Sequence, residues 1–343
     1  VNAHLHTPYS FSAFSGVVDA LDRASAEGVK VVGINDFYSM DGYAEWVSEA
    51  RNRKLYPLLG IEFISLNSED QAAGLRVNDP GNPGRTYLSG KGMAYPVKLS
   101  GEPARQLEEV RGEANRQVAQ MCGKVCGLFK SLGYDVDFDF EKIKATLTKG
   151  SVRERHLAKA IRLAVANLFA SESDQIAFYE KLFGGKALKS DIKDDAKVEN
   201  EIRGNLLKAS GAAFVPEDPK AFLPMATVRN IILAAGGIPT YPFLADDAKG
   251  GFTDFEGDLQ KAASTLKERG FHSVELITTR NSVDVIEQYS NYLWDNGFVV
   301  TFGSEHNTPA MEPIKRAASG GVDLTTRLKE LNYFGACIVA AHQ

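Results

Sequence analysis

The chain has 343 residues, of which 44% are hydrophobic and 24% charged, a composition typical of a globular protein. Its 39 basic and 44 acidic residues give a formal net charge of −5, which argues against a partner such as long nucleic acid but leaves room for local arginines that bind a small phosphorylated substrate. Three cysteines, no visible signal peptide and no apolar stretch approaching the ~18–20 residues of a membrane helix predict a cytoplasmic chain, with no membrane span and no disulfide framework.

The first third of the chain alternates predicted strands and helices. The strands are Val1–Leu5, Val29–Asn35 and Leu58–Leu66, each rich in apolar residues. The helices between them run from about residue 17 to 28 and over Tyr43–Arg53. Strand–helix–strand order predicts a parallel sheet, and polar residues at the ends of several strands predict a barrel whose site lies at the C-terminal mouth.

The middle of the chain is predicted to be mainly helical. Gln106–Leu132 has the apolar spacing of one long amphipathic helix, and 134–223 reads mainly as further helices joined by polar stretches. Before them, the Gly- and Pro-containing segment Asn78–Gly92 is predicted as an exposed loop, and Met93–Leu99 as a short strand. We therefore expect residues 100–223 to form a helical insertion at the barrel mouth.

Strands and helices alternate again toward the C-terminus. Helices are predicted at Ala226–Ala235, about 257–269 and Ser282–Asp295, with strands at Ile238–Tyr241, Ser273–Ile277 and Phe298–Phe302. The whole chain therefore has about seven predicted strands separated by helices, and a final apolar run follows at Ala336–Ala340. Residues 1–99 and 224–343 are therefore predicted to form one α/β barrel.

The most informative motif is His-Leu-His near the start of the chain. Side chains alternate along a strand, so His4 and His6 point to the same face, where both can bind one metal ion. Glu62 follows an apolar run that predicts a strand, and Glu305 and His306 follow another. Clustered imidazoles and carboxylates bind divalent metals, so this mouth of the barrel is a candidate site for a divalent metal ion.

The order of these motifs resembles the PHP family, named after polymerase and histidinol phosphatase. The matching segments are His-Leu-His at 4–6, Asn-Asp at 35–36, Gly-Ile-Glu at 60–62, Ala-Gly-Gly-Ile-Pro at 235–239 and Gly-Ser-Glu-His at 303–306. Members of the family are distorted (β/α)7 TIM-like barrels that typically hold two or three Zn, Mn or Fe ions and hydrolyse phosphoesters. The resemblance therefore implies an α/β fold of this type, with a helical insertion.

The same resemblance implies roles for individual residues. It assigns His4, His6, Glu62 and Glu305 to a first metal site, with Glu62 able to bridge to a second ion. It assigns His306 to a neighbouring ion, or to proton donation to the leaving oxygen. One or two divalent ions would then activate water for hydrolysis of a phosphoester.

Several of the family's usual metal ligands are absent from this chain. Phe11 stands where members usually have an aspartate, Phe37 ends what is usually Thr-Asp-His, and Tyr241 stands in what is usually Ala-His-Pro. A phenyl ring offers no lone pair, so we expect further metal sites to be eroded. Phe37 and Tyr241 instead predict an aromatic mouth that contacts a flat or apolar part of the substrate; alternatively, these rings only fill space left by lost metals.

Five other side chains are candidates for the site. Asp36 is expected either to orient one of the histidines or to cap the following helix. Arg153 and Arg155 can clamp a phosphate while His156 donates a proton, or they are an ordinary basic helix start. Arg280 follows a predicted strand and so points toward the mouth.

Two functions of different classes follow from these observations. The first is a metal-dependent hydrolase, a phosphoesterase for a small phosphorylated or nucleotide-like substrate. The second is a catalytically silent barrel that binds a ligand or partner through its aromatic mouth. Hydrolysis of C–N or C–O bonds at a single metal ion is a third possibility, which the arginines near the mouth oppose.

Overall fold

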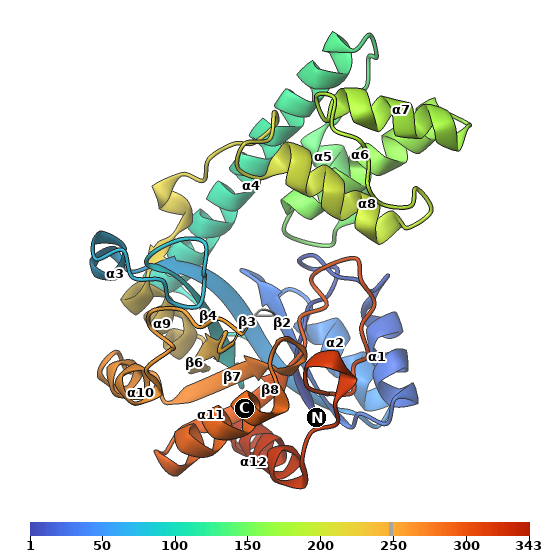
Figure 1. Cartoon of the computed structure of the whole chain (residues 1–343). Coiled ribbons are helices and arrows are strands. Elements are labelled where there is room, and N and C mark those ends of the chain that lie inside the picture. Colours follow the sequence, from blue (N-terminus) through green and yellow to red (C-terminus); the bar gives the residue numbers. More distant parts are fainter. Residues whose placement is uncertain (247–249) are drawn as a thin grey trace.

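The computed structural model describes residues 1–246 and 250–343. Seven strands form a nearly closed, barrel-shaped sheet (Figure 1) in the order β1-β2-β3-β4-β6-β7-β8. They are β1 (Asn2–Leu5), β2 (Val31–Phe37), β3 (Tyr56–Leu66), β4 (Arg85–Lys91), β6 (Ile238–Phe243), β7 (Ser273–Ile277) and β8 (Val299–Gly303), while β5 (Leu223–Pro224) pairs with β3 at the side. The predicted α/β, TIM-like barrel is confirmed.

Backbone hydrogen bonds bring the first and last strands of the barrel together. The N–H of Ser304 donates to the carbonyl of His4 at 3.1 Å, and the N–H of His6 donates to the carbonyl of Glu305 at 3.0 Å. The first strand, β1, and the last strand, β8, therefore meet at the histidine motif.

One strand runs against the others. β4 is antiparallel to both β3 and β6, whereas the remaining neighbours in the barrel pair in parallel. The predictions of a loop over Asn78–Gly92 and a strand over Met93–Leu99 were wrong, because the strand is Arg85–Lys91. Its sequence contains Ser, Gly and Lys, and a Cβ on Gly90 would lie 2.7 Å from the sulfur of Met93, so close packing rather than an apolar pattern selects these residues.

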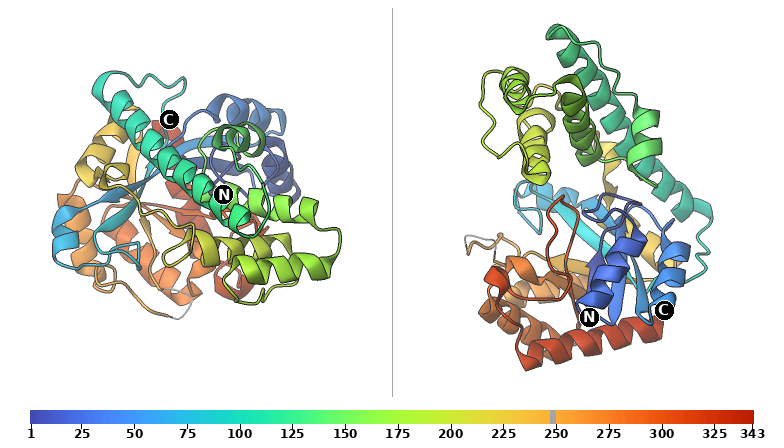
Figure 2. Two further views of the ribbon diagram at one scale, coloured as in Figure 1. Left: turned by 90° about the horizontal axis from the view of Figure 1, so that it is seen from above. Right: turned by 90° about the vertical axis from the view of Figure 1, so that its right-hand side faces the viewer.

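Helices cover the outside of the barrel. Each predicted helix of the barrel is present within about two residues, because an apolar face recurs every three to four positions; α1, for example, buries Val17, Ala20, Leu21 and Ala24. The barrel helices are α1 (Val17–Ala26), α2 (Tyr43–Asn52), α3 (Ser68–Ala72), α9 (Met225–Ala234), α10 (Leu259–Glu268), α11 (Val283–Asp295) and α12 (Thr326–His342). α12 lies across one end of the barrel, and the helices from the middle of the chain lie at the opposite end (Figure 2).

Those remaining helices form a layer over the other end of the barrel (Figures 1 and 2). They are α4 (Gly101–Ser131), α5 (Phe140–Leu147), α6 (Glu154–Leu168), α7 (Glu172–Leu182) and α8 (Asp195–Ile202), followed by the π-helical turn η1 (Arg203–Leu207) and the 3-10 turn η2 (Pro219–Ala221). Two further 3-10 turns, η3 (Thr278–Arg280) and η4 (Ser319–Gly321), lie in the C-terminal part of the chain. None of the helices in the described ranges is both long and apolar enough to cross a bilayer.

The helical layer has a hydrophobic core distinct from that of the barrel. α4 contributes to both cores: Leu107 and Val110 pack in the barrel core, whereas Val118 and Phe129 pack among the helices. That residues 100–223 form a separate insertion therefore stays a prediction, since one continuous helix belongs to both cores.

The helical layer is tied to the loop that follows β1. The N–H of Lys149 donates to the carbonyl of Pro8 at 2.8 Å, and the N–H of Ser151 donates to that of Tyr9 at 3.1 Å. A Cβ on Gly150 would lie 2.5 Å from the carbonyl oxygen of Tyr9, so the two segments approach more closely than any larger residue would permit. This contact places the start of α6 at the barrel mouth.

Candidate metal centre and its cavity

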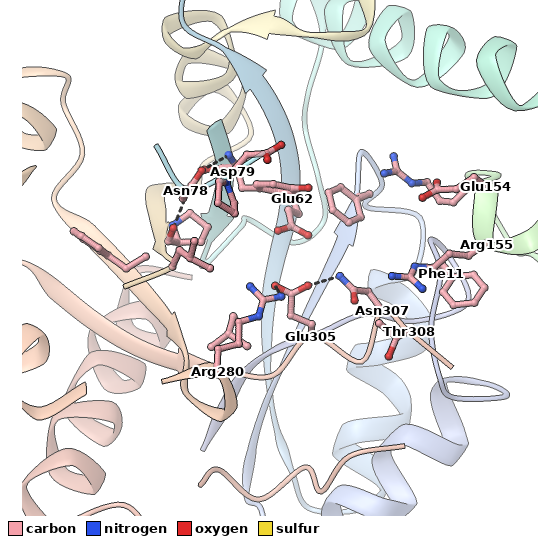
Figure 3. Close-up of a pocket in the computed structure, with 18 of the residues that line it drawn as sticks. Phe11, Glu62, Asn78, Asp79, Glu154, Arg155, Arg280, Glu305, Asn307 and Thr308 are labelled. Atoms are coloured by element: carbon pink, nitrogen blue, oxygen red, sulfur yellow. Dashed lines mark hydrogen bonds and ion pairs between the residues drawn. The ribbon is translucent and has the colours of Figure 1, made fainter. Parts of the chain in front are cut away.

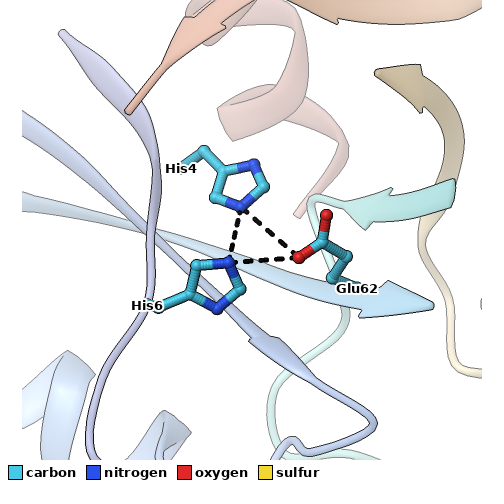
Figure 4. Close-up of side chains that lie close together, drawn as sticks. All are labelled: His4, His6 and Glu62. Carbon is cyan, nitrogen blue, oxygen red and sulfur yellow. Dashed lines mark hydrogen bonds and ion pairs between the residues drawn. The ribbon is translucent and has the colours of Figure 1, made fainter. Parts of the chain in front are cut away.

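Three buried side chains converge at the mouth of the barrel (Figure 4). The Nε2 atoms of His4 and His6 lie 3.2 Å apart, and the Oε2 atom of Glu62 lies 3.1 Å from Nε2 of His6 and 3.8 Å from Nε2 of His4. β1 and the residue just after it supply the histidines, and β3 supplies the glutamate. Among the residues that the structure describes, this is the one group of three or more His, Cys, Asp or Glu side chains that could hold a metal ion.

The donor atoms of this cluster fit a divalent ion. Oε2 of Glu62 is buried and accepts no hydrogen bond, which is costly for a carboxylate oxygen unless a cation occupies the space before it. Around a tetrahedral ion with bonds of about 2.0–2.1 Å, ligand atoms lie about 3.3–3.4 Å apart, close to the observed spacing. Burial also lowers the pKa of both histidines, which keeps the imidazoles neutral as metal ligands must be.

A glutamate on β7 orients His4. Oε2 of Glu275 accepts a hydrogen bond from Nδ1 of His4 at 2.6 Å, which leaves the lone pair of Nε2 directed at the cluster. Glu275 was missed in the sequence. Its signal was a charged residue in the middle of the fully buried strand Ser273–Ile277, where an acid requires a partner.

Asp36 orients the second histidine through a serine. Nδ1 of His6 lies 3.2 Å from Oγ of Ser10, which donates in turn to Oδ1 of Asp36 at 2.6 Å. The N–H of Thr7 also donates to Oδ1 at 2.7 Å, and the hydroxyl of Thr7 donates to Oδ2, so both carboxylate oxygens are occupied within the protein. Asp36 is buried and does not line the cavity described below; its contacts are those of a residue that positions His6 through Ser10 and does not itself meet a substrate.

A cavity of about 390 Å³ opens beside the cluster (Figure 3). Four arginines line it, together with Glu62 and Glu305. Nη2 of Arg280 pairs with Oε1 of Glu305 at 2.9 Å, and Nε of Arg203 pairs with Oε1 of Glu154 at 2.9 Å. The other two arginines, Arg153 and Arg155, form no ion pair with a carboxylate in the described part of the chain.

The arginines and the aromatic residues of the mouth are stacked on one another. The ring of Phe37 stacks on His6 with centroids 5.1 Å apart, and the guanidinium of Arg153 lies 4.6 Å from the centroid of the same ring. The guanidinium of Arg155 lies 5.7 Å from the ring centroid of Phe11. Burial lowers the pKa of Arg155 to about 10, and the positive charge of the nearby Arg203 is the second cause. A bound anion would stabilise these clustered cations.

Glu305 and His306 do not lie where the sequence analysis expected them. Glu305 lines the cavity, where burial opposes ionisation but Arg280 holds the pKa of its carboxyl below the usual value; its carboxylate is not part of the three-residue cluster. His306 has a φ of 52°, and its Nδ1 and Nε2 contact Oγ of Ser304 at 2.7 Å and the carbonyl of Glu312 at 2.8 Å. Both ring nitrogens are therefore occupied away from the cluster, which corrects the expected roles of His306 as a metal ligand and as a proton donor.

Asn307 reaches the cavity in place of its neighbour. Its Nδ2 donates to Oε2 of Glu305, and both residues line the cavity (Figure 3). No sequence pattern predicts that Asn307 rather than His306 lines the cavity, because this depends on the backbone turn at His306.

Two further expected site residues are part of the protein interior. The hydroxyl of Tyr241 donates to Oε1 of Glu256 at 2.7 Å, and burial raises its pKa well above the usual value, so the phenol stays protonated. His156 accepts a hydrogen bond on Nδ1 from the N–H of Arg153 at 2.9 Å, and burial lowers its pKa to about 3. Neither side chain lines the cavity, which corrects the expected substrate contact by Tyr241 and proton donation by His156.

The contact beneath Tyr241 predicts a pH-dependent stability. Glu256 is buried, and burial raises its pKa to about 8 despite hydrogen bonds from Tyr241 and from the N–H groups of Leu244 and Ala245. A folded-state pKa above the unfolded value favours folding at low pH, so this contribution declines as pH rises from about 4.5 through 8. Between pH 6 and pH 8, wild type should lose about 2 kcal/mol of unfolding free energy relative to Glu256→Gln, measured by urea denaturation. Equal pH profiles for the two proteins would contradict the assignment.

A family comparison agrees with this geometry. The PHP domain family model matches residues 2–191, more than half of the chain. The chain belongs to the PHP family. Its described residues show a reduced version of the expected donor set, with one three-residue cluster and with Phe11 and Phe37 at positions where ligands were expected.

Two solved structures share the fold of this PHP protein. One is an amidohydrolase from Chromobacterium violaceum with bound sulfate and no metal, which has 14% sequence identity and a TM-score of 0.58, with 96% of each chain covered. The other is a protein from Bifidobacterium adolescentis assigned as a metal-dependent phosphoesterase, which has 15% identity and a TM-score of 0.59, with 97% of this chain and 95% of that chain covered. At these identities the similarity shows the fold alone. No curated protein sequence matches the chain.

Proposed function

We propose that this PHP protein is a metal-dependent phosphoesterase that acts on a small phosphorylated or nucleotide-like substrate. The observation that carries the proposal is that Glu62, one of the three residues of the His4–His6–Glu62 cluster, lines a cavity together with four arginines. These three residues would hold one divalent ion, Zn, Mn or Fe. Membership of the PHP family supports hydrolase chemistry of this kind.

The bound ion would supply a hydroxide nucleophile near neutral pH and charge stabilisation at the phosphoryl group. Arg153 and Arg155, which have no carboxylate partner in the described ranges, would bind the phosphoryl oxygens. Arg280, held by Glu305, adds a third cation to the lining of the cavity. Phe11 and Phe37 present flat surfaces beside these cations, suited to an apolar or ring-shaped part of the substrate.

A catalytically silent barrel that binds an anionic ligand is the second candidate. One observation favours it: Phe37 fills the space between His6 and Arg153, at a position where family members usually have a ligand. In that case the cavity would still bind anions through Arg155 and Arg153, without hydrolysing them.

Metal content and phosphate release distinguish the two functions. Untagged protein purified without chelator should contain about one Zn, Mn or Fe ion per chain, measured by elemental analysis. The same protein should release inorganic phosphate from at least one member of a panel of sugar phosphates, nucleotides and aryl phosphates, and lose that activity reversibly with chelator. No bound metal, and none taken up when it is added, would exclude the hydrolase and leave the binding protein.

Substrate binding should depend on Arg155. We expect Arg155→Met to raise KM about 10–100-fold, because a charge-assisted hydrogen bond contributes about 1.5–3 kcal/mol, and to leave the metal content unchanged. Arg23→Met, which changes an exposed arginine paired with Asp19 on α1, is the matched control. An unchanged KM in the first variant would show that Arg155 does not contact the substrate.

A further inference from the structure

A lysine is buried in the barrel below the histidines. Lys91 is the last residue of β4 and is only 2% exposed. Its Nζ lies 2.8 Å from Oε1 of Glu275 and donates to the carbonyl of Ala3 at 3.0 Å and to Oδ1 of Asn35 at 3.1 Å. The acceptors come from β7, β1 and β2, so one ammonium group connects four strands of the barrel.

Two of these acceptors contact the imidazole of His4. Oε2 of Glu275 lies 2.6 Å from Nδ1 of His4, and Nδ2 of Asn35 lies 3.2 Å from the ring nitrogens. Asn35 is held in turn by donation from Nδ2 to Oγ of Ser89 at 3.1 Å. The ammonium of Lys91 therefore fixes both groups that determine how the His4 ring is turned.

The lysine also places a positive charge under the candidate ion site, where it pairs with Glu275. A buried ammonium is stable only where carboxylates and carbonyls compensate it, and Glu275 provides that charge. A divalent ion at the cluster would bring a second positive charge into the same weakly screened interior, where like charges repel.

We infer that Lys91 tunes the ion site by its charge: its ammonium weakens cation binding, while its contacts with Glu275 and Asn35 hold the donor cluster assembled when no ion is bound. Glu275 contacts His4 directly, so removal of the lysine takes away the repulsion and leaves the orienting carboxylate of His4 in place. This inference rests on the proposed metal site. A purely structural lysine would join the strands without changing the affinity for metal.

Metal affinity separates these two roles. Chelator-stripped wild type, Lys91→Met and Glu275→Gln are titrated with Zn²⁺ in competition with a chromophoric chelator, and thermal unfolding is followed in the presence of chelator. Lys91→Met should bind Zn²⁺ about tenfold or more tightly, because the repulsion is removed, yet unfold at a lower temperature without metal. Glu275→Gln should bind Zn²⁺ about 10–100-fold more weakly, because His4 loses its orienting carboxylate.

Control variants make each result decisive. Lys98→Met removes an exposed lysine and should change neither measurement. Lys91→Gln keeps a donor for Glu275 without the charge, and should also tighten Zn²⁺ binding if Lys91→Met does not fold. Zn²⁺ affinity that is unchanged or weaker in both Lys91 variants, beside a wild type that binds Zn²⁺, would overturn this inference alone. A wild type that binds no Zn²⁺ would overturn the proposed function together with it.

Discussion

Replacing His4 and His6 together by alanine should remove the bound ion and reduce phosphoester hydrolysis by about 10³-fold or more. The two imidazoles supply two of the three donors in the cluster, and Glu62 alone cannot retain the ion. A metal ion contributes several kcal/mol of transition-state stabilisation, and each 1.36 kcal/mol corresponds to a factor of ten in rate. The measurements are metal content per chain and the initial rate of phosphate release.

His272→Ala is the matched control for this double variant. His272 is exposed, precedes β7 and lies outside the cavity lining, so its replacement should leave metal content and rate unchanged. Glu62→Gln, which preserves volume but removes the negative charge, should also lose the ion. Full activity in the double variant would show that hydrolysis takes place at another site.

Gly303→Ala should disrupt the same site from the far end of the chain. Gly303 ends β8, and a Cβ there would lie 2.3 Å from the Cβ of His4 and 3.1 Å from its backbone nitrogen. His4 must therefore move, although the two residues are separated by almost the whole sequence. We expect a loss of about 1–3 kcal/mol in unfolding free energy and about a 100-fold loss of activity, because displacement of a catalytic group by about 1 Å has effects of that size.

Gly123→Ala provides the control for this substitution. Gly123 lies in the interior of α4, is exposed, and has no atom within 4 Å of an added Cβ. Alanine is a better helix former than glycine by about 0.5–1 kcal/mol, so this variant should be slightly more stable and equally active. Chemical denaturation and phosphate release measure both effects; wild-type activity and stability in Gly303→Ala would contradict the close packing of β8 on β1.

The regular elements of the fold were largely predictable because their sequence patterns are local. The predicted strand Ser273–Ile277 agrees with β7 residue for residue, and the predicted helix Ser282–Asp295 differs from α11 by one position. β4 was missed because Ser89, Gly90 and Lys91 suit a crowded barrel interior and resemble a loop when read alone. The residues of such a strand are selected by contacts with distant segments.

The candidate site was predictable to a similar extent. Period-two alternation placed His4 and His6 on one face, and the end of a predicted strand placed Glu62 beside them. His306, His156 and Tyr241 were assigned from their position along the chain, and the structure turns all three away from the cavity. The direction in which a side chain points depends on backbone turns and packing that no local pattern records.

The sequence by itself determined the α/β class, the PHP family and the histidine motif, because these depend on residue periodicity and on short motifs. The tertiary structure decided which charged side chains meet: Glu275 beside His4, Lys91 beneath both, and Arg153 over Phe37. These partners lie on different segments of the chain. Glu275 and His4 are 271 residues apart in the sequence, and Lys91 and Asn35 are 56 residues apart. Closure of the barrel brings them together. Because burying an uncompensated charge is energetically costly, the buried charged groups are paired with one another.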